Sequence, residues 1–453
     1  MKKVDFESGK ITQNILQTAL PMLAAQVLNL LYSIVDRIYI GRISGAGTEA
    51  LGAVGLCFPI IMIVSAFTNM FGLGGAPLFS IELGKGDRKK AGEIQNTGFC
   101  LLVITAVLIT LIGELFGGGL LMLFGATRNE LPMSLSYLRI YLIGTLPLML
   151  STGMNPYITA QGYAVIGMVS VTAGAVTNIL LDPLFIFSFG MGVQGAAAAT
   201  VISQFLSVLI VFRFLLGKAN EFPVRFGLHF PHAGKIIGLG LAPFIMQMTN
   251  SLVQISCNNM LMIYGGMTYV SIMTIVSSVR SILDVPVMAV TEGTSPIISY
   301  NYGAGKAGNV HKAVRVMMLI AVPYTFVIWL LVLVNPQMFI RIFSSDETVL
   351  LDASRALHIY FAAFIFQSLQ YCGQTVFKAL NRRKQAIFFS LLRKVVLVVP
   401  LTLLLPGAFH LGTDGVFLAE PVSNVIGGLA CFLTMHFTVG KEIRRMEAQN
   451  LRI

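Results

Sequence analysis

Apolar residues occur in long runs along the chain, interrupted by short polar connections that are rich in Gly, Lys and Arg. About 20 mostly apolar residues are enough for a helix to cross a bilayer, and every one of these runs is longer than that. The pattern therefore predicts an all-α integral membrane protein with twelve transmembrane helices, at residues 15–41, 51–82, 96–125, 134–161, 164–188, 193–217, 234–264, 267–300, 313–343, 353–380, 385–408 and 414–438.

The two halves of the chain resemble each other. Residues 74–77 (GGAP) align with 293–296 (GTSP), and 84–86 (GKG) align with 303–305 (GAG), at the same offset in both cases. A constant offset across a half indicates duplication. Each half holds six spans and so inserts in the same direction, which predicts a parallel repeat of two pseudo-symmetric six-helix lobes. We expect an N-lobe at 1–221, a cytoplasmic linker at 222–235 and a C-lobe at 236–453, with a central site that opens by alternating access.

Composition and charge agree with a membrane protein. The 453 residues are 55% hydrophobic and 11% charged, whereas about 25% of residues are charged in a soluble domain. The net charge is +11, and the basic residues gather in alternate connections, which predicts cytoplasmic termini for an inner-membrane protein. This distribution explains the positive charge without a nucleic-acid partner. No CxxC pair or GxxxxGK[ST] motif is present, so we expect no cofactor, no nucleotide hydrolysis and no enzyme activity.

A polar stripe runs along the first predicted span. Ser33, Asn29 and Gln26 precede Asp36 by three, seven and ten positions, which puts all four on one helical face. Such a stripe can serve helix-to-helix hydrogen bonding. An ionisable group inside a span is costly, however, and the carboxylate favours a functional interpretation.

A second carboxylate lies in the fifth span. Asn178 precedes Asp182 by one helical turn, so the two side chains share a face. Pro183 follows directly and prevents a hydrogen bond to the carbonyl of Ile179. Carboxylate, amide and carbonyl oxygens suit a small hard cation, and the carboxylate also suits a proton. The alternative is a structural kink satisfied by a neighbouring Arg or Ser.

The second half carries a different set of polar residues. When Pro21 is aligned with Pro243, Asp36 falls on Asn258, and the seventh span has a neutral stripe of Gln247, Asn250, Ser251, Gln254 and Asn258. We infer that ion coupling belongs to the first half and that the second supplies part of the cavity. Glu292 and Glu420 either line that cavity or form structural pairs. Arg280 and Asp284, one helical turn apart, are expected to pair, and Lys378, Arg393 and Lys394 to snorkel to the cytoplasmic surface.

Five segments carry a resemblance to a known family: VDRIYIGR (35–42), GLGGAPLFSIELGKGD (72–87), TNILLDPLFIF (177–187), GVQGAAAAT (192–200) and SYNYGAGK (299–306). Together they resemble the MATE family, the multidrug and toxic compound extrusion transporters, and most closely its bacterial branch with a coupling site in the N-terminal lobe. The resemblance implies a monomeric antiporter that exports organic cations in exchange for Na⁺ or H⁺. It places the coupling site, and the Na⁺ ligands of a sodium-coupled protein, on Asp36, Asn178, Asp182 and Thr200.

Three other functions compete with this one. A lipid-linked sugar flippase of the same superfamily needs cationic side chains in the cleft to bind pyrophosphate. A membrane enzyme that modifies lipids needs a clustered acidic metal motif, for which Asp346 and Glu347 are the nearest candidate. A channel needs no rocking lobes, and uptake that ignores ion gradients would indicate one.

Overall fold

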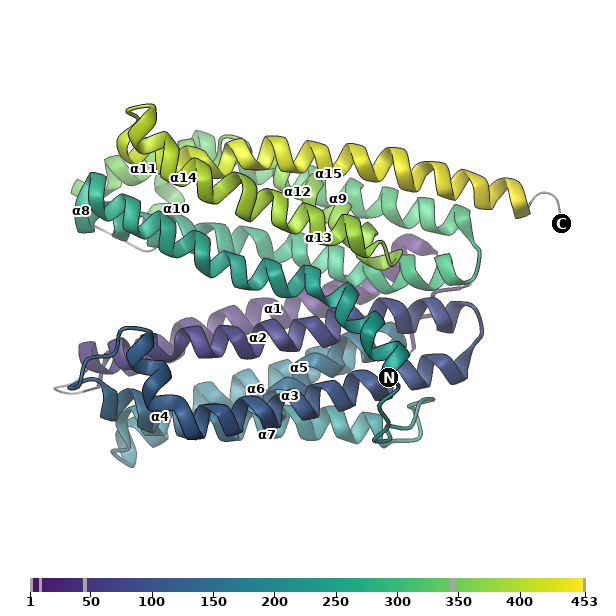
Figure 1. The fold of residues 1–453 in the computed structure, drawn as a ribbon, viewed down its shortest axis with the longest axis horizontal. Helices are drawn as coiled ribbons and strands as arrows, with labels where there is room; N and C mark the ends of the chain where they lie inside the picture. Colours follow the sequence, from purple (N-terminus) through teal and green to yellow (C-terminus); the bar gives the residue numbers. More distant parts are fainter. Residues whose placement is uncertain (1–2, 8–9, 44–46, 343–346, 451–453) are drawn as a thin grey trace. The chain divides into compact units, whose positions relative to one another are not determined.

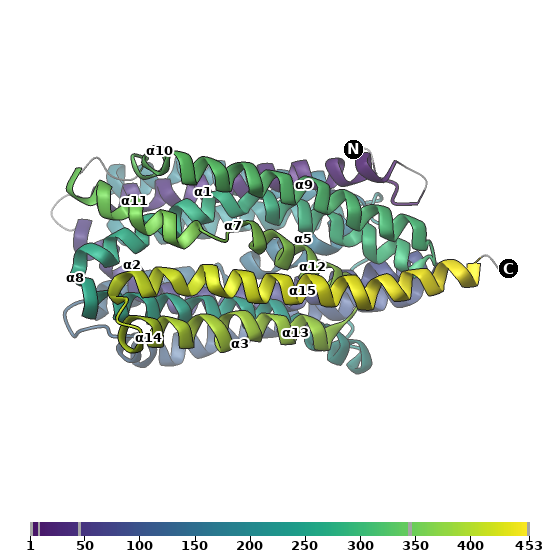
Figure 2. The same ribbon diagram turned by 90° about the horizontal axis from the view of Figure 1, so that it is seen from above.

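The computed structural model describes residues 3–7, 10–43, 47–342 and 347–450, and all of the regular structure in these ranges is helical (Figure 1). Figure 2 shows the same helices from above. The helices are α1 (Ile11–Gly41), α2 (Gly47–Gly84), α3 (Arg88–Leu123), α4 (Leu131–Ile143), α5 (Thr145–Ala160), α6 (Ala164–Pro183), η1 (Leu184–Ser188), α7 (Gly192–Leu215), α8 (Phe230–Gly303), α9 (Ala307–Val334), α10 (Pro336–Ile340), α11 (Glu347–Phe361), α12 (Ile365–Ala379), α13 (Arg383–Leu391), η2 (Leu392–Val398), α14 (Val399–Ala408) and α15 (Gly412–Asn450).

These helices account for the twelve predicted spans. Nine helices in the described ranges are long and apolar enough to cross a membrane, and α4 with α5, bent by 52°, makes a tenth. Helix α8 covers two predicted spans, because Gly266 (φ 69°, ψ −166°) is not helical and separates them. Helices α11 and α12 flank a short break within the predicted span 353–380. The protein is an all-α membrane protein with twelve transmembrane helices in two six-helix lobes, as the sequence predicts.

The chain divides into two compact units whose boundaries differ from the lobe limits expected from the sequence. The first unit is mainly Leu20–Phe244, and the second combines Phe6–Ala19 with Ile245–Ile453. Each half therefore gives the first turns of its first helix, α1 or α8, to the other unit. Residues 236–244, expected in the C-lobe, pack in the core of the first unit, where Ile236 and Leu239 are fully buried.

Two glycines related by the repeat accommodate these exchanged turns. A Cβ on Gly74 would lie 2.6 Å from the carbonyl oxygen of Ile236 and 2.7 Å from the Cα of Gly240. In the second unit a Cβ on Gly293 would lie 2.9 Å from the Cα of Ala19. The aligned motifs at 74–77 and 293–296 thus share a role, which is the close approach of a helix backbone.

Left-handed backbone conformations repeat between the halves in the same way. Positive φ angles recur at nearly the offset that relates the sequence motifs, in the pairs Gly86 and Gly305, Gly162 and Asn381, Gly190 and His410, and Gly192 and Gly412. Two of these positions in the second half are not glycine, although L side chains rarely adopt this conformation. The local backbone geometry therefore supports the duplication independently of residue identity.

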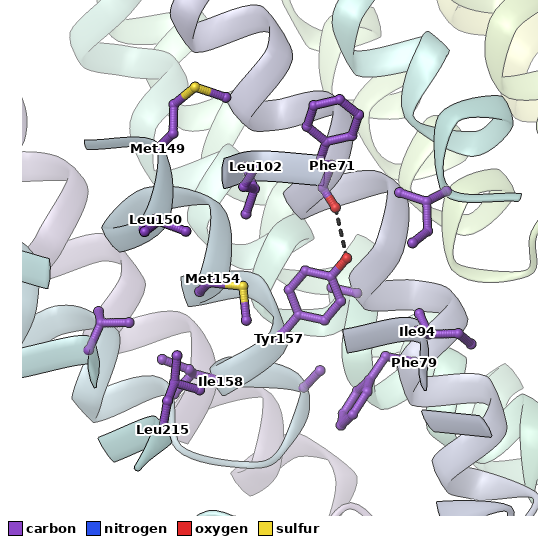
Figure 3. Packing of buried hydrophobic residues seen from close by; sticks show 14 of the residues in the cluster. Phe71, Phe79, Ile94, Leu102, Met149, Leu150, Met154, Tyr157, Ile158 and Leu215 are labelled. Atoms are coloured by element: carbon purple, nitrogen blue, oxygen red, sulfur yellow. Dashed lines mark hydrogen bonds between the residues drawn. The ribbon is translucent and has the colours of Figure 1, made fainter. Parts of the chain in front are cut away.

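The core of the first unit is built around Tyr157 of α5 (Figure 3). The side chain is completely buried, and its hydroxyl donates a 2.9 Å hydrogen bond to the carbonyl oxygen of Phe71 in α2. The ring has room because Gly75 and Gly98 have no side chains: a Cβ on them would lie 1.7 and 2.1 Å from the phenolic oxygen. Helices α2, α3 and α5 are therefore joined around a single phenol.

We expect Gly98→Ala to destabilise the first unit by about 1–3 kcal/mol, because the added methyl overlaps the Tyr157 hydroxyl and overpacks the core. Gly118→Ala is the matched control in the same helix, since a Cβ there meets nothing within 4 Å. Thermal unfolding of the two purified variants measures the effect. Equal melting temperatures for the two variants would contradict this account of the Tyr157 core.

Candidate functional site

The polar stripe predicted on α1 has mixed exposure in the structure. Gln26 and Ser33 are half-buried and Asn29 is exposed. The Ser33 hydroxyl donates to the carbonyl oxygen of Leu30 at 2.9 Å, as isolated polar groups in apolar helices commonly do. Asp36 is half-buried, but its Oδ1 atom is buried and has no hydrogen-bond partner. Asp36 is therefore the member of the stripe whose buried side-chain oxygen lacks a hydrogen-bond partner.

The second carboxylate lies where an α-helix changes its winding. Asp182 is fully buried near the end of α6, and Pro183 is followed directly by the π-helix η1. Single π-turns in helices occur frequently at functional sites. Helix α7 approaches this segment closely, since a Cβ on Gly195 would lie 2.7 Å from the carbonyl carbon of Phe185.

The four residues that the family resemblance implicates lie together in the first unit. The Asn178 amide donates to Asp182 Oδ1 at 3.2 Å and to the Thr200 hydroxyl at 3.3 Å. The carboxyl groups of Asp36 and Asp182 lie within electrostatic range of each other. Helices α1, α6 and α7 thus direct one carboxylate pair, one amide and one hydroxyl to a single point.

Three oxygens at this point are buried without a hydrogen-bond partner: Asp36 Oδ1, Asn178 Oδ1 and Asp182 Oδ2. Buried polar atoms are usually satisfied, so these three oxygens are available to accept from or coordinate a bound group. Two neighbouring carboxylates also repel each other unless a proton or cation lies between them. The arrangement can therefore hold a small hard cation or a shared proton.

Two tyrosines near the carboxylates were not singled out from the sequence. Tyr32, one turn before Asp36 on α1, lies within electrostatic range of both carboxylates, and Tyr137 of α4 lies within range of Asp36. The spacing of Tyr32 from Asp36 was a signal available in the sequence. Nothing in the sequence marked Tyr137, which is contributed by a separate helix.

A second group of charges is buried in the C-lobe. Oxygen Oε1 of Glu420 contacts three cations: Arg280 Nη1 at 2.6 Å, Arg393 Nη2 at 2.5 Å and Lys394 Nζ at 3.5 Å. Arg280 also pairs with Asp284 at 3.3 Å, which confirms the predicted i,i+4 pair. With every group charged, this C-lobe cluster of three cations and two anions has an excess of one positive charge.

The prediction that Arg393 and Lys394 snorkel to the cytoplasmic surface was wrong. They are only 3% and 6% exposed and point at Glu420. Both residues belong to the π-helix η2, which rotates less per residue than an α-helix and lets neighbouring side chains point in similar directions. Lys378 is half-buried and lies within electrostatic range of Glu292. Glu420 itself is paired structurally, which was one of the two roles left open for it.

The neutral stripe of α8 is partly self-satisfied. The Gln254 amide donates to Asn258 Oδ1 at 3.1 Å. Gln247 is half-buried, like Glu292 on the same helix, whereas Asn250 is exposed. In the described part of the chain no group of three or more His, Cys, Asp or Glu side chains could hold a metal ion, and Asp346 lies outside that part. Among the described residues, buried oxygens without a partner also occur in the second unit, on Gln367, Gln370 and Asn424, but none of these belongs to a carboxylate.

The model of the MatE family matches residues 21–184 and 243–404, one segment in each half. The chain belongs to the MatE family. The two matched MatE segments correspond to the duplicated lobes, and the first contains Asp36, Asn178 and Asp182.

This MatE protein has relatives of nearly its own length. It is 23% identical over 434 residues to the multidrug export protein MepA of Staphylococcus saprophyticus, covering 95% of both chains. It is 25% identical to a protein of Shewanella oneidensis named FAD transporter, covering 94% of both chains. A solved multidrug resistance MATE transporter in an outward-facing conformation has the same fold, with a TM-score of 0.90, 21% identity and 99% coverage of both chains. These relatives are transport proteins, which agrees with the expectation that the MatE protein is not an enzyme.

Proposed function

We propose that this protein is a secondary active exporter of organic cations, driven by the inward movement of Na⁺ or H⁺ through the site formed by Asp36, Asn178, Asp182 and Thr200. The observation that carries the proposal is the set of three buried oxygens without partners beside that carboxylate pair. The naming of similar proteins as multidrug exporters supports the substrate class. The charge of the connections supports cytoplasmic termini in a bacterial inner membrane.

Coupling follows from the charge of the site. When Asp36 and Asp182 are ionised, the first lobe attracts a cationic substrate. A proton or Na⁺ between the carboxylates neutralises that attraction and satisfies the buried oxygens. The ion and the substrate therefore favour different states of the protein, and this difference in affinity is the condition for exchange. The α6–η1 junction at Pro183 is the element we propose to change shape between those states.

We propose that each half contributes its own polar stripe to substrate binding. These residues are Gln26, Asn29 and Ser33 on α1 in the first half, and Gln247, Asn250, Gln254, Asn258 and Glu292 on α8 in the second. Neutral amides and hydroxyls orient a substrate without fixing one chemical structure, which suits a range of organic cations. Glu420 belongs to the C-lobe cluster, and we assign it a structural role.

Transport in everted membrane vesicles tests the proposal. A fluorescent organic cation is supplied outside, and a Na⁺ gradient and a proton gradient are imposed separately. We expect one gradient to drive accumulation. Passive equilibration of the cation that ignores both gradients would contradict ion coupling and indicate a channel. If the cation does not move under either gradient, organic cations are excluded as the substrates of this protein.

Replacing Thr200 by valine distinguishes the two ions. A hydroxyl oxygen can coordinate Na⁺ but contributes little to a proton shared between carboxylates. For sodium coupling we expect Thr200→Val to raise the Na⁺ concentration at half-maximal transport by roughly 10-fold, about the value of one hydrogen bond to a charged group. Thr200→Ser keeps the hydroxyl and is the matched control. An unchanged Na⁺ dependence in the valine variant would exclude Thr200 as a sodium ligand.

A second candidate function follows from the C-lobe cluster. Its excess positive charge and the 15% exposure of the Arg280 side chain favour an anionic substrate such as an organic pyrophosphate. This class also includes the substrates of lipid-linked sugar flippases and agrees with the relative named FAD transporter. The same vesicles test it with fluorescent FAD in place of the cation. FAD transport that survives Asp182→Asn but not Arg280→Gln would favour this function.

A further inference from the structure

We infer that the C-lobe carries a binding groove for an anionic phospholipid, formed by α9 and α15. The groove has a volume of about 710 Å³ and is lined mainly by apolar side chains. Helices α9, α12 and α15 pack against one another in the second unit (Figure 2). The groove is therefore part of one lobe and is separate from the proposed coupling site in the other.

Four basic or titratable side chains occur at one end of the groove. His311 and Arg315 come from the first turns of α9, and His436 and Arg444 come from the last turns of α15. All four are exposed, and within the described ranges none of them forms an ion pair. No Asp or Glu lines the groove. Charge at this end of the groove is therefore positive and uncompensated.

The spacing of these residues gives each helix one continuous face toward the groove. His311 and Arg315 are four positions apart on α9, and His436, Gly440 and Arg444 are successively four apart on α15. Residues at this spacing lie one above the other on a helix. Gly440 leaves space between the two basic positions of α15, and Arg444 Nε donates to its carbonyl oxygen at 3.2 Å.

The rest of the groove is apolar and continues toward the lipid. Met318, Val322, Phe432 and Met435 line it, together with Leu319, whose side chain is 62% exposed. An exposed leucine on a membrane span can contact hydrocarbon. A basic end beside an apolar wall matches the phosphate and acyl chain of a phospholipid, and basic pockets between transmembrane helices bind such head groups.

Positive charge at the ends of spans also orients proteins in the membrane. That role does not require the charged residues to line a groove. Orienting charges sit in connections between spans. Here the charges sit on two helices, at or near the ends of their predicted spans, and all of them border the same groove. Charge complementarity therefore assigns the groove to an anionic phospholipid of the leaflet that this end of the helices reaches.

Native mass spectrometry of the purified full chain with phosphatidylglycerol and phosphatidylcholine tests the inference. We expect phosphatidylglycerol to be retained in preference to phosphatidylcholine. The double variant Arg315→Gln/Arg444→Gln should lower its retention by about tenfold. Gly440→Leu, which fills the groove and keeps every charge, should lower it as well. Lys89→Gln/Lys235→Gln, which removes two exposed cations from the first unit, should leave retention unchanged.

Three results would overturn the lipid site. Equal retention of the two lipids would remove the charge selectivity. An equal loss of phosphatidylglycerol in the lysine control would reduce the effect to general surface attraction. Complete displacement by millimolar inorganic phosphate would identify a soluble anion as the ligand. If Gly440→Leu does not elute as folded protein, the arginine pair compared with the lysine pair still decides the question.

Discussion

Replacing Asp182 by asparagine is expected to reduce gradient-driven export by about 10- to 100-fold at equal expression. The change removes a charge but keeps the size of the side chain, so it acts on coupling more than on packing. Without the Asp182 carboxylate the ion no longer distinguishes the two states of the transporter, and coupling energies of about 1–3 kcal/mol correspond to this range. The rate of substrate accumulation in everted vesicles measures the loss.

Asp352→Asn is the matched control for this substitution. Asp352 lies on α11 in the second unit, is half-buried and forms no ion pair in the described part of the chain. We expect this control to transport like the unaltered protein. Wild-type transport by Asp182→Asn would contradict the coupling site, and equal losses in both variants would point to a general effect on folding.

Replacing Glu420 by glutamine is expected to destabilise the protein by about 3–5 kcal/mol, because removing one partner of a buried ion pair leaves an uncompensated charge. The side chain is only 3% exposed, and its Oε1 atom is the shared partner of Arg280, Arg393 and Lys394. The loss of the partner costs far more than the pair contributes when intact. The apparent melting temperature and the yield of monodisperse protein measure the effect.

Two variants control for this prediction. Glu442→Gln removes a carboxylate from the same helix, but Glu442 pairs with Arg382 where both are partly exposed, so we expect a change of about 0–1 kcal/mol. Lys394→Met removes the cation with the longest contact to Glu420 and cancels the excess positive charge. We expect Lys394→Met to be tolerated or stabilising. Strong destabilisation by Lys394→Met would contradict the excess of one positive charge assigned to the C-lobe cluster.

Much of the N-lobe site could be predicted because its residues are recognisable from the local sequence pattern. Asp36 and Asp182 are ionisable groups in apolar runs, and Asn178 stands one turn before Asp182. Helical periodicity was therefore sufficient to pair Asn178 with Asp182. The convergence of α1, α6 and α7 depends on tertiary packing, which the local sequence pattern does not show. Thr200 was identified only from the resemblance to the MATE family.

The C-lobe cluster could not be predicted in the same way. Arg393 and Lys394 lie near the start of a predicted span, and a long cationic side chain there ordinarily reaches the surface. Their partner Glu420 is distant in the sequence and belongs to another helix, α15. Nothing in the local pattern shows that the π-helix η2 turns both cations inward.

The twelve spans were predicted because length and apolarity are sufficient to identify them. The exchange of helix ends was not, since α1 and α8 each read as one uninterrupted span at their first turns. A run of apolar residues does not show that its first turns pack in a different unit from the rest. The glycines at 74 and 293 were visible as a repeat, but only the structure gives them a physical role.

That exchange bears on how the duplicated chain arose. The core of the first unit includes Ile236 and Leu239 from the second half of the chain, and within the second unit Gly293 packs against Ala19 from the first half. A single half, expressed alone, lacks the turns that complete it. Two identical halves could supply them to each other as a domain-swapped homodimer. Fusion of such halves makes the swap intramolecular and fixes its stoichiometry. The two copies can then diverge, one toward a pair of neighbouring carboxylates and the other toward a buried ionic cluster.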